Sequence, residues 1–175
     1  MPDPGPHDVL VPPVEHADAS STSSRRLRVG AYVVLVLLVL AGLVGLFGVR
    51  SSTVEGSDGP LTVSVEHAGV ARAGLAVPFT VTVQRSGGFD GPVEVRVSSD
   101  YMSRIDEHGL DPEPDSVASD GEWLTWRWDE VEGDTHEVDF DGRIEPGIHW
   151  RFGGSVQVRT ASELVHVDID TWIAP

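Results

Sequence analysis

The sequence predicts an all-β fold, an antiparallel β-sandwich, preceded by one transmembrane α-helix. Two observations support this prediction. Residues 29–49 form 21 consecutive positions without a charge, and from Pro60 onward apolar and polar residues alternate in seven separate segments. Alternation gives each strand one buried and one solvated face, as in antiparallel sheets. Seven such strands, separated by glycine, proline and aspartate and without a helical period, favour a sandwich.

Residues 1–28 are predicted to be a disordered cytoplasmic tail. Residues 1–24 hold five prolines, four acids and a run of five hydroxyl residues at positions 20–24. This composition buries too little apolar surface to offset the entropy lost on ordering. The hydroxyl run beside the arginines is either a phosphorylation site that changes the charge near the membrane or part of a flexible leader, and the composition favours the leader.

The uncharged run of residues 29–49 is predicted to be a transmembrane helix. At about 1.5 Å per residue it reaches about 31 Å, the thickness of the hydrocarbon core of a bilayer. Arg25, Arg26 and Arg28 precede the run and only Arg50 follows it. Basic residues stay on the cytoplasmic side, so we expect the N-terminus inside and the C-terminal domain outside the cell membrane.

A cleaved signal peptide is the alternative interpretation of the same run. Secretory apolar regions span about 7–15 residues and end at a small-x-small site, whereas this run is longer and ends beside Arg50. An uncleaved anchor is therefore favoured. Within the run, Ala41 and Gly45 form a small-xxx-small pair. Such a pair permits close approach of a partner helix, although it is also common by chance.

The composition excludes several kinds of chemistry. The chain has no cysteine, lysine or asparagine, and all 12 basic residues are arginine. The absence of cysteine excludes disulfides, a lipoprotein anchor and thiolate sites. The absence of asparagine excludes N-glycosylation and Lys–Asn isopeptide bonds. The exclusive use of arginine, together with abundant alanine, glycine, valine, aspartate and proline, is typical of a GC-rich bacterial genome, such as an actinobacterial one.

Charge is unevenly distributed along the chain. Residues 51–175 carry 24 acids and 8 arginines, a net charge of −16. Such a surface repels nucleic acid, anionic polymers and anionic lipid headgroups. The sequence therefore predicts no nucleic-acid partner.

Residues 50–59 are predicted to be a flexible linker, because they are rich in serine, glycine and acids. Residues 60–175 are predicted to form one extracytoplasmic domain. Its strands are expected around the following apolar residues: Leu61, Val63 and Val65; Phe79, Val81 and Val83; Val93, Val95 and Val97; Leu124, Trp126 and Trp128; Val138 and Phe140; Val156 and Val158; Val165, Val167 and Ile169.

One stretch supports a family resemblance. The segment AGLAVPFTVTVQRSG, from Ala73 to Gly87, resembles the second strand of Ig-like conserved-repeat domains of bacterial surface proteins. The Trp126-x-Trp128 strand and the GDTHEV segment from Gly133 follow in the order of that family. The resemblance covers roughly residues 60–173 and consists mainly of strand patterning. It implies an Ig-like fold and an adhesive or structural role, in a single copy rather than the family's usual tandem repeats, and transfers no catalytic residue.

The longest stretch without strand signals, Asp106 to Glu122, holds seven acids in 17 residues. It carries a calcium-loop spacing at positions 1, 3, 5, 7, 9 and 12, namely Asp111, Glu113, Asp115, Val117, Ser119 and Glu122. Ser116 replaces the glycine of the sharp turn, and two prolines stiffen the loop. We therefore expect a solvated acidic loop and keep Asp111–Glu122 as the alternative calcium site.

Carboxylates also recur on two predicted strands. Glu137, Asp139 and Asp141 share one face of a strand, and Asp168 and Asp170 share one face of another. We expect these faces to be solvated, which discourages edge-to-edge aggregation. A pair of glycosidase carboxylates is the minor alternative, because spacing along a strand does not define a cleft.

All five tryptophans lie beyond residue 122. Trp126 and Trp128 share the parity of the core residues and are expected to be buried. Trp123 lies on the opposite face, and Trp150 and Trp172 lie near turns or the end of the domain. For each of these three we expect an interface ring or a core plug; exposed rings would suit a carbohydrate-binding or peptide-binding sandwich.

The histidines show no paired-ligand spacing of the H-x-x-x-H type. Those of the C-terminal part are His67, His108, His136, His149 and His166. No nucleophile elbow surrounds a serine and no glycine-rich phosphate loop occurs. We assign no catalytic, cofactor-binding or metal-ligating residue and expect no enzymatic activity.

The sequence thus predicts a membrane-anchored interaction or structural module, expected to be an accessory subunit of an envelope complex. Its expected partners are the membrane, crossed once, and an envelope protein. The alternative is a tethered module that binds cell-wall polysaccharide, which requires Trp150 or Trp172 to be exposed. A protein-partner role requires the helix or an apolar patch of the sandwich. A small hydrolase, the third class, requires a cleft with converging carboxylates or histidines.

Overall fold

A computed structural model of the chain describes residues 19–43, 48–147 and 150–174. The chain divides into two compact units, Met1–Phe47 and Gly48–Pro175. The first unit contributes one helix, α1 (Ala19–Leu43), of 25 residues. The fold is all-β apart from α1 and one short helix of the second unit.

Helix α1 is long and apolar enough to cross a membrane. Its segment Ser24–Leu43 has a mean hydropathy of 2.0, a composition that both membrane spans and signal sequences share. The predicted disorder is wrong for residues 19–28, because these residues continue the helix toward the N-terminus. Arginine and leucine are good helix formers, and the last proline of the tail, Pro13, precedes them. Residues 1–18 and 44–47 lie outside the described residues.

The second unit contains eleven strands and a short helix within its described residues. Their bounds are β1 (Arg50–Asp58), β2 (Leu61–Ala71), β3 (Ala76–Val77), β4 (Phe79–Arg85), β5 (Val93–Ser98), α2 (Ser99–Met102), β6 (Ile105–Asp111), β7 (Ser116–Ser119), β8 (Trp123–Trp128), β9 (Thr135–Ile144), β10 (Arg151–Arg159) and β11 (Leu164–Ile173). All seven strands that the alternation predicts are confirmed, as β2, β4, β5, β8, β9, β10 and β11.

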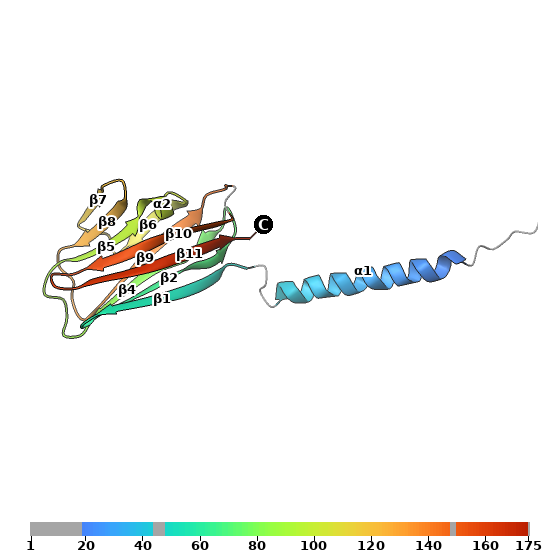
Figure 1. Cartoon of the computed structure of the whole chain (residues 1–175), viewed down its shortest axis with the longest axis horizontal. Helices are drawn as coiled ribbons and strands as arrows, with labels where there is room; N and C mark the ends of the chain where they lie inside the picture. The colour runs from blue at the N-terminus through green and yellow to red at the C-terminus, as the bar shows by residue number, and fades with distance from the viewer. Residues whose placement is uncertain (1–18, 44–47, 148–149, 175) are drawn as a thin grey trace, which may run out of the picture. The chain divides into compact units, whose positions relative to one another are not determined.

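The strands form two antiparallel sets joined along one side (Figure 1). One set has the order β1-β2-β4-β9-β6, with β3 also on β9. The other has the order β11-β10-β5-β8-β7. A parallel pairing of two residues on β2 and two on β11 connects them.

The inward faces of the two sets pack against each other. Trp126 of β8 lies 6.0 Å from Phe140 of β9 between ring centroids. Tyr101 of α2 lies 6.0 Å from Phe79 of β4. The alternating pattern places the valines of both sets in this core. In β9, exposed and buried positions alternate strictly along the whole strand. The hydroxyl of Tyr101 is buried and satisfied by Thr171 Oγ1 at 2.9 Å.

The predicted linker at residues 50–59 is wrong. These residues form β1, which pairs with β2 from Arg50 opposite Val70 to Asp58 opposite Leu61. Val49, the last residue of the uncharged run, packs against the core of the same unit. The last two residues of the run, Gly48 and Val49, therefore belong to the second unit.

The predicted loop at residues 106–122 is also only partly a loop. Its first part continues β6, which pairs with β9, and its later part contains β7, which pairs with β8. Two of the acids that remain in turns, Asp115 and Asp120, accept hydrogen bonds from backbone N–H groups. Asp120 Oδ1 accepts from the N–H of Glu122 and of Trp123, at 3.0 and 2.7 Å.

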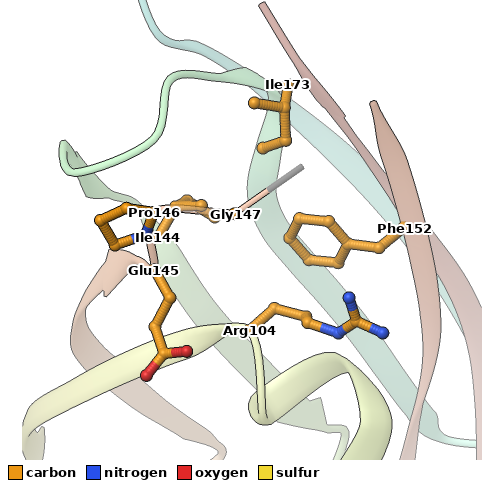
Figure 2. A pocket seen from close by; sticks show the side chains of 7 residues that line it. All are labelled: Arg104, Ile144, Glu145, Pro146, Gly147, Phe152 and Ile173. Atoms are coloured by element: carbon orange, nitrogen blue, oxygen red, sulfur yellow. The ribbon is translucent and has the colours of Figure 1, made fainter. Parts of the chain in front are cut away.

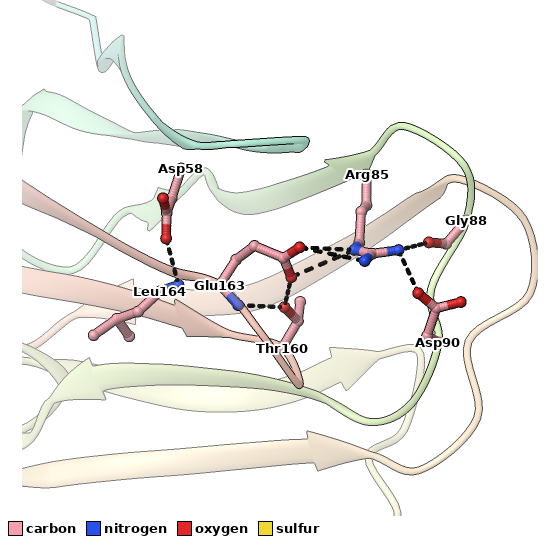
Figure 3. Close-up of polar contacts among 7 residues, drawn as sticks. All are labelled: Asp58, Arg85, Gly88, Asp90, Thr160, Glu163 and Leu164. Atoms are coloured by element: carbon pink, nitrogen blue, oxygen red, sulfur yellow. Dashed lines mark hydrogen bonds and ion pairs between the residues drawn. The ribbon is translucent and has the colours of Figure 1, made fainter.

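A polar cluster joins the two sets at the Asp58 end of β1 (Figure 3). Arg85 of β4 donates to Glu163, in the β10–β11 turn, at 3.3 Å. Arg85 also bonds Gly88 O and pairs with Asp90 at 3.0 Å, and Thr160 donates to Glu163. The hydrogen bond from Thr160, and then those from Arg85, lower the pKa of Glu163.

Candidate functional site

The side of the domain opposite the β2–β11 junction carries two adjoining hollows between β6 and β7. One has a volume of about 320 Å³ and is lined by Leu110, Glu113, Pro114, Val117, Leu124 and Trp126. The other has a volume of about 270 Å³ and is lined by Ser99, Met102, Ser103, Ile105, Ser119 and Leu124. Because Leu124 lines both, we treat them as one feature, the β6–β7 groove.

The groove is apolar at its base and acidic at its rim. Trp126, Met102 and Ile105 are buried at the base, while Val117 is 59% exposed. Glu113 lines the rim, and the exposed Asp111 precedes it by two residues. This pattern suits an apolar ligand with basic groups beside it.

Two groups at the groove lack partners within the described part of the chain. The Oγ atom of Ser99 is buried without a hydrogen-bond partner. Strand β7 pairs with β8 alone, so its outer edge presents free backbone groups. Its four residues, SVAS, carry no charge and are all exposed. An uncharged, exposed edge strand is a ready template for an added strand.

The edge of β6 is less suited to pairing. Its register with β9 shifts between Glu107 and Gly109. A bulge of this kind interrupts an edge and blocks regular pairing. The groove therefore offers one good edge, on β7.

The calcium-loop residues do not surround a common point. Asp111 ends β6, Val117 and Ser119 lie in β7, and these strands pair with different neighbours. Asp115 Oδ2 instead accepts the N–H of Asp129 at 2.7 Å. Among the described residues, no group of three His, Asp or Glu side chains is arranged to hold a metal ion.

The predicted solvated carboxylates are exposed on the outer faces of β9 and β11. Glu137, Asp139 and Asp141 occupy exposed positions of β9. Asp168 and Asp170 do the same on β11.

The outer face of β11, β10, β5 and β8 carries a polar cluster around Trp123. Its ring lies 6.5 Å from that of His166 and 5.2 Å from the Arg96 guanidinium. Ser155 Oγ donates to Asp168 Oδ1 at 2.7 Å, and this bond lowers the pKa of Asp168. The carboxylate lies between the serine and His166, whose Nε2 is 3.2 Å from it. The hydroxyl of Ser155 thus donates to a carboxylate and not to the imidazole of His166.

Trp126 and Trp128, which share the strand parity of the core residues, are buried as predicted, whereas Trp150 and Trp172 are exposed. Trp126 and Trp128 are buried, at 2% and 4% exposure. Trp150 and Trp172 are 68% and 53% exposed, so the core-plug expectation for these two is wrong. Trp172 is stacked beneath the Arg151 guanidinium at 5.1 Å.

Two of the histidines that the structure describes lie in the core, while His166 is exposed and pairs with Asp168. His67 and His136 are buried, and His136 meets the Trp128 ring edge-on at 4.8 Å. Burial lowers the pKa of His136. His149 and the side chain of His108 lie outside the described residues.

The groove could not be identified from the sequence. It is built from α2, β6, β7 and β8. These elements are close together because the chain passes from β6, which pairs with β9, to β7 and β8 of the other set. The only local signal was the weak apolar content of Ser116–Ser119.

Comparisons with known proteins add no family assignment. No family model matches this chain, and no curated protein matches it either.

Proposed function

We propose that this protein is a membrane-anchored, non-catalytic interaction module of the cell envelope that binds an extended segment of a partner protein in the β6–β7 groove. The observation that carries this proposal is the combination of an apolar groove, a free β7 edge and the unpartnered Ser99 hydroxyl at one place. An added strand on β7 gains main-chain hydrogen bonds, while the groove receives its alternate side chains.

Anchoring is supported by the length and flanking charges of the uncharged run. Arg25, Arg26 and Arg28 precede it and favour a cytoplasmic N-terminus. The β domain then lies outside the cell.

An Ig-like classification is supported by strand order. The orders β2-β4-β9 and β11-β10-β5 correspond to the A-B-E and G-F-C strands of Ig sandwiches. Strand β6 takes the place of D beside β9, but it precedes β7 and β8 in the chain, which is a departure from the Ig order. This departure leaves β7 as an edge and opens the groove.

Photocrosslinking in the native membrane tests the proposal. A benzophenone side chain at position 117 of the full-length chain is expected to capture one stoichiometric envelope protein, and the same group at the exposed position 66 is not. Val117→Asp is expected to abolish capture of that protein by full-length chain. Ala118→Asp is the matched control, because Ala118 is adjacent on β7 but does not line the groove. Equal capture at both positions, or by both variants, contradicts the groove as the site.

A wall-polysaccharide ligand is the second candidate, because Trp150 and Trp172 are exposed. It predicts that the full-length chain sediments with purified wall polymer and that Trp172→Ala releases it.

A further inference from the structure

One end of the β domain gathers the segments at which the chain enters and leaves the sheets. Hydrogen bonds tie these segments together: Gly74 N donates to Ile144 O at 2.8 Å, and Glu145 N to Arg104 O at 2.9 Å. Ile173 N donates to Trp150 O at 2.9 Å. Arg50, the first residue of β1, lies opposite Val70 at the same end, near the last residues of β11 (Figure 1). We call this the Arg50 end.

The Arg50 end concentrates the arginines of an otherwise acidic domain. Five of the nine arginines in residues 50–174 lie there, namely Arg50, Arg72, Arg104, Arg143 and Arg151. Most of the 24 acids lie elsewhere; those described at the strand ends here are Asp100, Asp106, Glu145 and Asp170, with Asp141 just inside. The strong net negative charge is therefore a property of the rest of the domain.

Exposed apolar side chains gather at the same end. Trp150, Trp172 and Leu75 are 68%, 53% and 46% exposed. Beside them, Arg104, Phe152 and Ile173 line a hollow of about 60 Å³ (Figure 2), which is too small for an acyl chain. Tryptophan beside arginine is the composition that proteins place at the level of lipid headgroups.

The covalent chain brings this end close to the bilayer if the uncharged run is its anchor. Helix α1 ends at Leu43 and β1 begins at Arg50, so only the six residues 44–49 link the two, and Val49 already packs against the β core. The exposed Arg50 and Arg143 supply planar donors that match phosphate oxygens, while Arg151 also pairs with Asp170 at 2.8 Å and Arg104 with Asp100 at 3.5 Å. Because the five arginines of this end offset the five acids named there, the repulsion from anionic lipid that the net charge of the domain predicts is largely absent here.

We infer that the Arg50 end rests on anionic phospholipid headgroups of the outer leaflet, with Trp150 and Trp172 seated among them. The inference rests on the anchoring proposed above, but not on the β6–β7 groove. It identifies a lipid surface as a second partner of the domain.

Tryptophan quenching in nanodiscs tests this contact. The uncharged run contains no tryptophan, so all emission comes from the β domain. The full-length chain is placed in phosphatidylglycerol-containing discs whose lipids carry bromine either near the glycerol backbone or near the chain ends. Shallow bromine is expected to quench more than deep bromine. The double variant Trp150→Phe, Trp172→Phe is expected to lose most of this quenching, and Trp123→Phe to retain it.

The arginines are tested in the same discs. Arg143→Gln with Arg151→Gln is expected to reduce the quenching, whereas Arg159→Gln, at the opposite end of β10, is not. Replacement of phosphatidylglycerol by phosphatidylcholine should have the same effect as the double variant. The unquenched emission of the buried Trp126 and Trp128 reports that each variant is folded.

Four results overturn the inference. Quenching that persists without Trp150 and Trp172 places other residues at the lipid. If the quenching is unchanged both in the arginine variants and in phosphatidylcholine discs, the anionic headgroup is not the partner. Loss of the intact β domain from the discs overturns the anchoring as well, whereas a retained chain with unquenched Trp150 and Trp172 overturns only the contact.

Discussion

At the scale of single residues, Glu163 shows how the two sheets are held together at the end away from Arg50. Its carboxylate accepts from Thr160 and Arg85 and is only 9% exposed. A carboxyl whose pKa is lowered in the folded state stabilises that state above its ordinary pKa, here 4.5, and the stabilisation is lost as the pH falls below that value.

Glu163→Gln should therefore lower the melting temperature of the β domain at neutral pH. The difference from the unchanged chain should shrink as the pH falls through and below 4.5, because both side chains are then neutral. The exposed Glu132→Gln provides the control. A difference that stays constant down to strongly acidic pH would show that the variant acts through packing rather than through charge.

At the scale of elements, β1 is one of the strands that the sequence did not predict. Only Val54 among its nine residues is a large apolar residue and it is half-buried, so no alternation marks the strand. Edge strands bury one side weakly and need little apolar content. Strand β7 was missed for the same reason, because it is also an edge strand with little buried apolar surface. Each of the seven predicted strands contributes one face to the core and therefore alternates between apolar and polar residues.

Gly56 provides the test of β1 as a strand. A Cβ atom at this position would lie 2.7 Å from Val165 Cγ1 and 2.8 Å from Val167 Cγ1, both on β11. Overpacking of this kind costs about 1–3 kcal/mol, so Gly56→Ala should lower the urea midpoint of unfolding. Gly109→Ala, on β6, is the matched control, because a Cβ there has no atom within 4 Å. A flexible linker at residues 50–59 would leave both variants unchanged.

At the scale of the whole molecule, net charge and its placement carry different information. The count of acids and arginines predicts repulsion from anionic surfaces, but it cannot show that five arginines converge from β1, β9, β10 and the turns between other strands. That convergence depends on which strand ends share one end of the domain, a property of topology. The groove has the same origin, since Leu110, Val117 and Leu124 meet only because β6 and β8 join different sheets.

The excess of acids also predicts how salt acts on stability. Glu137, Asp139 and Asp141 recur on one face of β9 at about 7 Å intervals, within the screening length of about 10 Å at 0.1 M salt. Salt also weakens the exposed arginine–carboxylate pairs, but such pairs each contribute only about 0–1 kcal/mol. Acids outnumber arginines by more than two to one in the domain, so relief of repulsion should prevail and the melting temperature in neutral-lipid discs should rise with sodium chloride. Glu137→Gln should reduce this rise and Arg159→Gln should increase it; a melting temperature that falls with salt would mean that the ion pairs dominate.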